Sequence, residues 1–187
     1  MRVLVTGGSG YVGSSTVREL AAAGHDILVY DNLSTGHRKL SAGFELIQAD
    51  ISDKERLRSC LKNVDAVMHF AASAYVSESV SNPRKYFHNN VESALALMDS
   101  VLESNVRILV FSSSCAVYGV PQILPVEESS PKEPINPYGA TKLFFSSVCF
   151  PPTAFRTDYV SLPCATSTQP EPTAVARLAR SIHRKRI

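Results

Sequence analysis

The sequence predicts a doubly wound α/β fold, in which a parallel sheet carries helices on both faces. Two patterns and the composition lead to this prediction. Short apolar runs alternate with amphipathic stretches over residues 1–145, and a glycine-rich segment follows the first apolar run directly. Of the 187 residues, 44% are hydrophobic and 19% are charged, which suits a single packed domain and argues against a disordered chain.

The predicted strands are short, apolar and bounded by turn or polar residues, as is typical of strands buried on both faces. They cover residues 2–6, 26–30, 44–48, 66–70 and 108–112. Amphipathic stretches between them predict helices over residues 11–23, 53–62 and 83–104. Strands that alternate with helices form βαβ units, so the sheet is expected to be parallel.

A long loop is predicted for residues 119–137. This segment holds five prolines among glutamate and serine residues, and proline lacks the backbone N–H that strands and helix interiors need. Loops of this length in a compact domain are usually functional. A further helix is expected to begin near Pro137, because proline suits the first helical turn.

The periodic pattern ends after Phe145, so residues 1–145 are predicted to form the domain. Residues 146–187 contain five prolines and are expected to be an irregular tail with a short basic helix at 174–186. The last thirteen residues hold five basic and no acidic side chains, whereas the whole chain has a net charge of +2. The body is therefore acidic, with a net charge of −3. This distribution argues against nucleic-acid binding.

No feature of the sequence predicts a membrane or secreted protein. No apolar run approaches the roughly 20 residues of a membrane span, and the glycine-rich segment begins too early to leave room for a signal peptide. Cys60, Cys115, Cys149 and Cys164 lack both the spacing of a zinc site and the density of a disulfide framework. We expect a soluble cytoplasmic protein without a metal site.

The glycine-rich segment has the spacing of a dinucleotide-binding loop. Gly7, Gly10 and Gly13 recur every third residue between the first strand and the first helix. Such glycines allow a tight turn, bring backbone N–H groups against a pyrophosphate and let the helix pack on the strand. Asp31 ends the second strand, where a carboxylate accepts hydrogen bonds from a ribose and favours NAD over its phosphorylated form. Arg38 could instead meet a 2′-phosphate, although a solvated loop arginine is the simpler interpretation.

A second group of polar residues follows the fifth strand. Ser112, Ser113 and Ser114 close this strand, and Tyr138 and Lys142 lie one turn apart in the helix after the proline-rich loop. Because ligands bind at the carboxyl ends of parallel strands, these side chains are expected to face one crevice. A lysine ammonium beside a phenol lowers the phenol pKa from about 10, which would make Tyr138 usable as a base near neutral pH.

These motifs resemble the extended short-chain dehydrogenase/reductase superfamily, and within it the UDP-glucose 4-epimerases of the NAD-dependent epimerase/dehydratase family. The resemblance rests on TGGSGYVG (6–13), DNLSTG (31–36), FAASAYVSESV (70–80), NPRKYFHNNV (82–91), FSSSCAVYG (111–119) and NPYGATKLF (136–144). It implies a Rossmann-like sheet with bound NAD as the cofactor.

The resemblance also implies roles for individual residues. Ser114 would hydrogen-bond the sugar 4-oxygen, Tyr138 would act as the base, and Lys142 would bind the nicotinamide ribose. The residues implied to bind the dinucleotide are Gly7, Gly10, Tyr11, Val12, Gly13, Asp31, Asn32, Asp50, Ile51, Phe70, Ala71, Ala72, Asn89, Tyr138 and Lys142. Of these, Asp50 and Ile51 would meet the adenine.

The implied activity interconverts UDP-galactose and UDP-glucose through a 4-keto sugar, so a UDP-sugar is the implied substrate. The rival 4,6-dehydratases need an acid pair after the strand-end hydroxyl, but Cys115 and Ala116 stand there and cannot protonate a leaving hydroxide. Another nucleotide-sugar epimerase, such as a uronic acid epimerase, and a catalytically incompetent dinucleotide-binding fragment both stay open. Relatives pair through the helices near 83–104 and after Tyr138, so a homodimer is one alternative, and the sequence leaves the oligomeric state open.

The resemblance ends after Phe145, except at residues 158–162. On this resemblance we expect the C-terminal substrate domain of the family to be missing and the helix that carries Tyr138 to end near Phe145. Where relatives continue with a motif resembling RYFNAAGA, this chain has ATSTQPEP at 165–172. One choice of codons encodes both strings in neighbouring reading frames. We therefore hypothesise that the tail is an out-of-frame reading of an epimerase-like gene.

Overall fold

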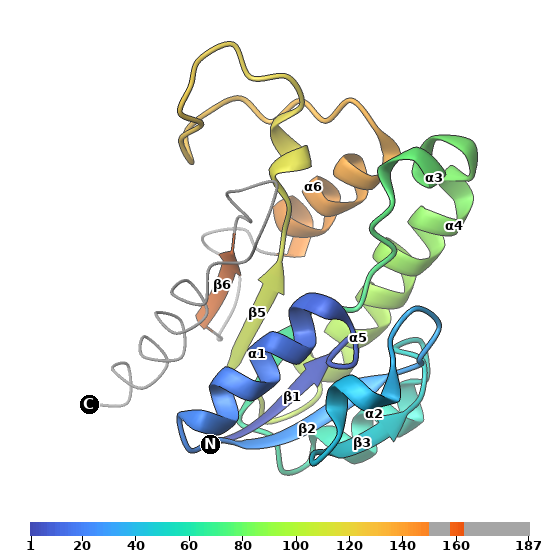
Figure 1. The fold of residues 1–187 in the computed structure, drawn as a ribbon, viewed down its shortest axis with the longest axis vertical. Helices are drawn as coiled ribbons and strands as arrows, with labels where there is room; N and C mark the ends of the chain where they lie inside the picture. The colour runs from blue at the N-terminus through green and yellow to red at the C-terminus, as the bar shows by residue number, and fades with distance from the viewer. Residues whose placement is uncertain (150–157, 163–187) are drawn as a thin grey trace.

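The structure is a computed structural model that describes residues 1–149 and 158–162. Within these ranges, six strands form one parallel sheet with the order β3-β2-β1-β4-β5-β6 (Figure 1). The strands are β1 (Arg2–Thr6), β2 (Asp26–Asp31), β3 (Glu45–Gln48), β4 (Ala66–His69), β5 (Ile108–Ser112) and β6 (Asp158–Leu162). The main helices are α1 (Tyr11–Ala22), α2 (Lys54–Leu61), α3 (Val76–Ser81), α4 (Pro83–Phe87), α5 (Ser93–Leu102) and α6 (Pro137–Cys149). The predicted doubly wound, Rossmann-like fold is confirmed.

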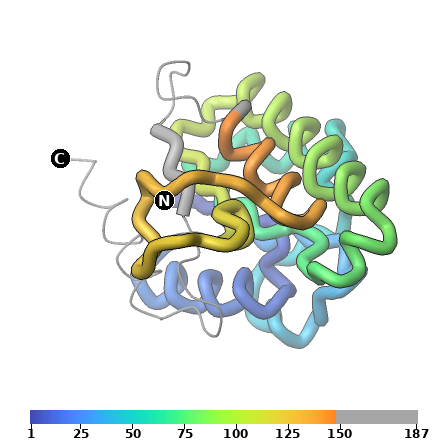
Figure 2. Tube along the Cα trace, turned by 90° about the horizontal axis from the view of Figure 1, so that it is seen from above, coloured from blue at the N-terminus to red at the C-terminus, as the bar shows by residue number. Residues whose placement is uncertain are grey.

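The two faces of the sheet bury separate apolar cores. One core joins the sheet to Leu57 of α2, Leu97 of α5 and Phe145 of α6. The other joins it to Val17 and Leu20 of α1. Figure 2 shows α1 on one side of the molecule and α5 and α6 on the other. Successive residues of β1 alternate between the two cores, because side chains of a strand point to opposite faces.

The strand order predicts a ligand-binding crevice at the carboxyl ends of the strands. Strand β1 pairs with β2 on one side and with β4 on the other, so the chain winds outward to β3 and then returns past β1. Ligands of doubly wound folds bind where the winding direction changes, at the carboxyl ends of the strands. In Figure 1, α3 and the long loop between β5 and α6 lie at this end of the molecule.

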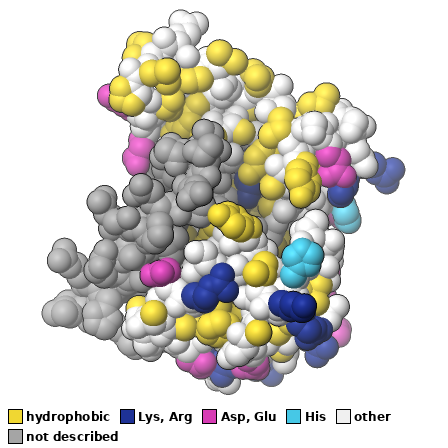
Figure 3. All heavy atoms as spheres, viewed as in Figure 1, with side chains coloured by type: hydrophobic (Ala, Val, Ile, Leu, Met, Phe, Trp, Pro, Cys, Tyr) yellow, Lys and Arg dark blue, Asp and Glu magenta, His cyan; other side chains and the backbone are white. Residues whose placement is uncertain are grey.

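The loop between β5 and α6 exposes several apolar side chains. Val120, Ile123 and Leu124 are 73%, 80% and 76% exposed, and hydrophobic side chains cover this part of the surface in Figure 3. No helix within residues 1–149 and 158–162 has both the length and the apolar character that crossing a membrane requires.

The predicted strands and the first two helices are confirmed, with ends that differ by no more than one residue. The predicted helix at 83–104 is instead broken into α4, a π-helical turn η2 (His88–Glu92) and α5. Across this turn, the hydroxyl of Ser93 donates a hydrogen bond to the carbonyl of His88, five residues earlier. The short helix α3 was not predicted, because its six residues carry too little pattern to be recognised in the sequence.

The chain keeps regular structure beyond Phe145, in contrast to the prediction of an irregular tail. Helix α6 continues to Cys149, because no proline interrupts it before Pro151. Strand β6 pairs in parallel with β5, and it is formed by the one stretch of the tail that resembled the family. The expected basic helix at 174–186 and the segment ATSTQPEP lie outside the described residues.

Candidate active site

The glycine-rich loop packs against the start of the segment that follows β4. Gly7 has a positive φ of 70°, and a Cβ there would lie 2.6 Å from the backbone nitrogen of Ala71. A Cβ on Gly13, in the first turn of α1, would collide with the carbonyl oxygen of Gly7. Only glycine fits at both positions, so the loop, α1 and β4 approach one another by their backbones.

The first turn of α1 offers backbone donors toward the crevice. Gly10 caps the helix without a side-chain hydrogen bond, and the first turn contains no acidic residue. Tyr11 and Val12 begin the helix, and the side chain of Tyr11 is largely exposed. Unpaired N–H groups at a helix N-terminus form an anion site, so this turn suits a pyrophosphate.

Asp31 lies buried at the carboxyl end of β2, beside the glycine-rich loop. The backbone N–H of Ser9 donates to its Oδ2 at 2.9 Å, and the N–H of Leu33 donates to its Oδ1 at 2.8 Å. An ionised carboxylate has about four acceptor positions, so two are left for a ligand. Asp31 is therefore held in place while it keeps the capacity to accept two hydroxyl groups.

A polar network surrounds the residues predicted to meet the adenine end of the dinucleotide. The amide of Asn32 donates to Oδ2 of Asp50 at 2.7 Å, and the hydroxyl of Tyr30 donates to the carbonyl of Asp50. Partial burial opposes ionisation of Asp50, but hydrogen bonds from Ser52 and Asn32 outweigh it and hold its pKa below the usual value. Ile51, by contrast, is buried in the apolar core.

The residues after β4 run alongside the glycine-rich loop. The N–H of Phe70 donates to the carbonyl of Thr6 at 3.0 Å, which continues the pairing of β1 with β4 by one more residue. Ala71 and Ala72 follow and are partly buried. This arrangement places Phe70 and Ala71 directly against Gly7, while their predicted contact with the dinucleotide stays a prediction.

Asn89 lies on the π-helical turn η2, next to this segment. Its amide donates to the hydroxyl of Ser73 at 3.3 Å and to Oδ1 of Asn90 at 3.0 Å. Asn90 in turn exchanges hydrogen bonds with the backbone of Ser73 and donates to Oγ1 of Thr141 on α6. The turn thus links the segment after β4 to α6, and π-helical turns often occur at functional sites.

Ser114 lies at the end of β5, where a short 3₁₀ turn η3 (Cys115–Tyr118) begins. Its hydroxyl accepts a hydrogen bond from the N–H of Ala116, and the residue is 8% exposed. Helix α6 packs closely on η3. A Cβ on Gly139 would lie only 2.5 Å from the carbonyl oxygen of Ala116, so glycine allows this close approach. This contact brings α6 against the turn that carries Ser114.

Lys142 is buried between β5 and α6, with 4% of its surface exposed. Its Nζ donates to the carbonyl of Ser112 at 2.9 Å and lies 4.8 Å from the ring centroid of Phe111 and 6.0 Å from that of Tyr138. A buried ammonium needs such partners, because desolvation alone would penalise the charge. Tyr138, one turn earlier on α6, is therefore beside a fixed basic group.

Comparison with known proteins identifies the family to which these motifs belong. The chain matches the NAD dependent epimerase/dehydratase family over residues 3–185. The chain belongs to this family. The UDP-glucose 4-epimerase of Lactobacillus helveticus is 48% identical over 151 residues, which are 79% of this chain and 46% of that protein. That of Streptomyces lividans is 46% identical over 146 residues, or 76% of this chain and 44% of that protein.

Solved structures of the family have the same fold. The UDP-glucose 4-epimerase of Brucella ovis in complex with NAD is 43% identical, with a TM-score of 0.80, over 87% of this chain and 51% of that chain. The enzyme of Stenotrophomonas maltophila with bound NAD and formylated UDP-arabinopyranose is 34% identical, with a TM-score of 0.84, over 87% and 52%. The chain therefore spans about half the length of the relatives it matches. The family match continues past Phe145, where the sequence predicted that the resemblance would end.

Two residues of this family member support Asp31 but were not predicted from the sequence. Ser9 holds the carboxylate through its backbone N–H, a role that depends on position and not on side-chain type. A Cβ on Gly36 would lie 3.0 Å from Oδ1 of Asp31, so a side chain there would press on this carboxylate and shift it by a few tenths of an ångström. The position of Gly36 at the end of DNLSTG was the one available signal.

His69 is a buried neutral residue beneath the site. Its Nδ1 lies 2.7 Å from the hydroxyl oxygen of Thr6, and its ring packs against the rings of Phe111 and Phe145. Burial, followed by the positive charge of Lys142, lowers the pKa of His69 to about 3. The single positive charge in this cluster of rings therefore belongs to Lys142.

We predict that His69 makes folding stability depend on pH. An unfolded imidazole binds a proton near pH 6.5, whereas the folded protein keeps His69 neutral down to a pH of about 3. The unfolded state thus binds more protons throughout this window, so stability falls as the pH falls. His69→Asn should reduce the slope of the unfolding free energy against pH by up to about 1.4 kcal/mol per pH unit. Urea unfolding at several pH values measures both slopes, and equal slopes would contradict the assignment.

Proposed function

We propose that the chain forms the NAD-binding half of a nucleotide-sugar 4-epimerase that interconverts UDP-glucose and UDP-galactose. The observation that carries the proposal is the position of Lys142, whose buried ammonium is fixed on the Ser112 carbonyl beside Tyr138. Lys142 and Tyr138 lie near the carboxyl end of β5, on the same side of the parallel sheet as the glycine-rich loop after β1 and Asp31 at the end of β2. UDP-glucose 4-epimerases are also the relatives that the chain matches.

The residues at the crevice fit NAD in two ways. Glycines leave the loop without side chains where a pyrophosphate would lie. No side chain caps the first turn of α1, so its backbone N–H groups can donate to an anion. Asp31 has two acceptor positions left, which suits the two hydroxyls of an unmodified ribose. Arg38 donates to the side-chain oxygen of Gln48 on β3, a neutral partner that leaves its charge available, so Arg38 does not decide between the two cofactors. Asp31 is the residue that favours NAD over its phosphorylated form.

The proposed reaction begins with proton removal from the sugar. Tyr138 accepts the proton of the sugar 4-hydroxyl, Ser114 donates a hydrogen bond to the 4-oxygen, and Lys142 stabilises the phenolate. NAD held by the glycine-rich loop and Asp31 would supply reversible hydride chemistry at C4 of the sugar. After the keto sugar turns its other face, Tyr138 gives the proton back to the 4-oxygen. The configuration at C4 is inverted, and no net oxidant is consumed.

The alternative to the epimerase is a dinucleotide-binding unit that does not turn over substrate. The chain spans 46% of a curated relative and 51% of a solved one, and an activity assay distinguishes the two functions. The rival dehydratase chemistry finds no acid pair after Ser114, since Cys115 and Ala116 occupy η3.

We also propose a cytoplasmic location, which is consistent with the free thiols of Cys60 and Cys115.

The decisive experiment separates catalysis from cofactor binding. The full chain is mixed with UDP-galactose and NAD, formation of UDP-glucose is assayed, and NAD binding is titrated by calorimetry. We expect turnover in the wild type and a loss of at least about 100-fold in kcat for Tyr138→Phe, because general acid–base catalysis contributes about 10²–10⁴-fold. Tyr138→Phe should still bind NAD. Binding without turnover in the wild type would support the fragment, and turnover with full activity of Tyr138→Phe would refute the assigned base.

Asp31 should control the affinity for NAD. Replacing it by Asn removes the charge that strengthens hydrogen bonds to the ribose and turns one of its two acceptor oxygens into a donor. Hydrogen bonds to charged groups contribute about 1.5–3 kcal/mol, so Asp31→Asn should weaken NAD binding by roughly 10- to 100-fold. Asp26→Asn, at the exposed start of the same strand, is the matched control and should bind NAD like the wild type. Equal affinities of the two variants would count against the ribose assignment.

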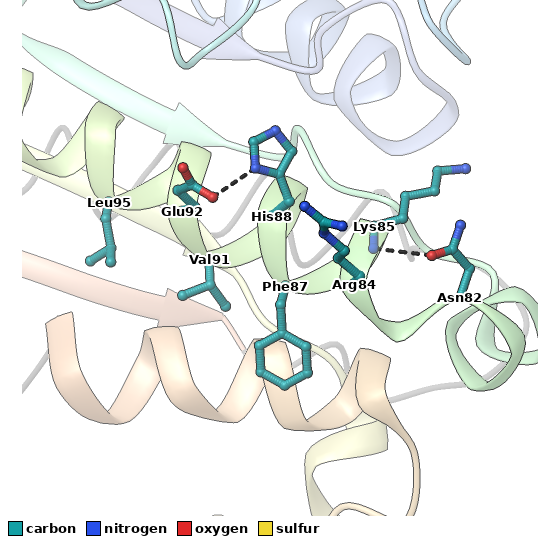
Figure 4. A pocket seen from close by; sticks show the side chains of 8 residues that line it. All are labelled: Asn82, Arg84, Lys85, Phe87, His88, Val91, Glu92 and Leu95. Atoms are coloured by element: carbon teal, nitrogen blue, oxygen red, sulfur yellow. Dashed lines mark hydrogen bonds and ion pairs between the residues drawn. The ribbon is translucent and has the colours of Figure 1, made fainter.

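We propose that two copies of the chain pair through α4, η2 and α5. Figure 4 shows Phe87, Val91 and Leu95 projecting from the same side of these helices. They line an open groove of about 700 Å³, and Phe87 is 45% exposed. Helix α6, which packs beside α4, exposes Phe144. A second copy that places the same apolar face against this one would bury these side chains, since symmetric pairs use one patch twice.

The dimer predicts a selective effect of charge on this face. Phe87→Glu should convert the dimer to a monomer, because pairing would bury two unpaired carboxylates. Ile123→Glu, on the exposed loop after β5, introduces the same charge elsewhere and should leave the dimer intact. Analytical ultracentrifugation of the three proteins measures the mass in solution. A monomeric wild type, or a dimer of Phe87→Glu, would contradict the proposed interface.

A further inference from the structure

Tyr86 is a buried tyrosine that has no part in the proposed reaction, yet it contacts the proposed base. It lies on α4 with none of its surface exposed. Its ring meets the ring of Tyr138 edge to face, with centroids 6.4 Å apart and an angle of 83° between the planes. Aromatic pairs favour this arrangement, and a fully buried partner restricts how the other ring can turn. Tyr86 therefore limits the orientation of Tyr138.

The hydroxyl of Tyr86 is directed to α3. Its oxygen lies 2.6 Å from the carbonyl oxygen of Tyr75 and 2.9 Å from Oε2 of Glu78, both of which are acceptors. Glu78 is also held by Lys85, whose Nζ donates to the other carboxylate oxygen at 2.6 Å. Tyr75 caps the N-terminus of α3, and its side chain is exposed. One phenol thus connects the proposed base to the start of α3.

The same contacts keep Tyr86 protonated. Burial, followed by the hydrogen bond and charge of Glu78, raises the pKa of Tyr86 to about 12. The groups that face it are Glu78 and the Tyr75 carbonyl from the α3 side and Tyr138 from α6, while Lys85 on its own helix neutralises Glu78. The phenols of Tyr86 and Tyr138 are neighbours, and that of Tyr86 keeps its proton near neutral pH.

We propose that Tyr86 is a positioning residue for Tyr138: its ring orients the ring of the base, and its hydroxyl anchors this pair to α3 at the rim of the crevice. The inference rests on the proposed function, in which Tyr138 removes the substrate proton. The ring and the hydroxyl of Tyr86 thus have separate roles. The ring should affect kcat, and the hydroxyl should affect substrate binding through α3.

Three variants separate these roles. Tyr86→Leu removes the ring, Tyr86→Phe keeps the ring and removes the hydroxyl, and Glu78→Gln weakens the anchor from the α3 side. We expect Tyr86→Leu to lower kcat by roughly 10- to 100-fold, because small displacements of a catalytic group are costly. Tyr86→Phe and Glu78→Gln should keep kcat near the wild-type value and raise KM for the UDP-sugar. NAD affinity should stay unchanged in all three.

A second readout does not need turnover. Nuclear magnetic resonance of isotope-labelled tyrosine identifies the signal of Tyr138 as the one lost in Tyr138→Phe. Its shift and titration should change in Tyr86→Leu and be restored in Tyr86→Phe. Should Tyr86→Leu not fold, as judged by thermal unfolding, Tyr86→Met fills a similar volume without a ring and replaces it.

The outcomes distinguish the inference from the proposed function. An inactive wild type would reject the proposed function, while the Tyr138 signal would still test the contact. An unchanged Tyr138 signal in the variant without the ring would overturn the positioning role. Equal losses of kcat in Tyr86→Phe and Tyr86→Leu would also overturn it, because the ring would then have no effect of its own.

Discussion

The close approach of backbone segments at Gly7 is the constraint on which the rest of the site depends. A side chain at Gly7 would strike the backbone of Ala71, and one at Gly13 would strike Gly7 itself. The backbones of the glycine-rich loop, α1 and the segment after β4 are therefore in direct contact. This packing places the N–H of Ser9 within hydrogen-bond distance of the Asp31 carboxylate, which fixes the end of β2. The dinucleotide end of the crevice follows from this packing.

Helix α6 organises the opposite end of the crevice. Gly139 lets it lie directly on the turn after Ser114, and Lys142 hydrogen-bonds the last residue of β5. Neutral His69 and the rings around it leave the lysine as the local charge. From the other side, Tyr86 connects Tyr138 to α3. Groups from β5, α4 and α6 thus meet around one phenol, although they are far apart in the sequence.

Sequence patterns predicted the strands because burial on both faces produces short apolar runs that stand out from their surroundings. Motif spacing and the family resemblance named the glycines, Asp31, Ser114, Tyr138 and Lys142 as site residues, and their roles stay predictions. The sequence patterns missed the break at His88–Glu92, since the pattern of apolar residues there is helical on both sides. They also missed the continuation of α6 to Cys149. They gave no role to Gly36, because its contacts with Asp31 and with the backbone of Ser9 form only when the chain folds.

The sequence by itself determined the fold class, the first five strands and the first two helices, and it supplied the chemical groups of the proposed site. These are local properties, because apolar periodicity and glycine spacing act within a few residues. Only the tertiary structure decided which groups meet: that the Lys142 ammonium rests on the Ser112 carbonyl, that His69 stays neutral below it and that Tyr86 supports the Tyr138 ring. These contacts join residues from different strands and helices, so their energies arise only when the chain packs.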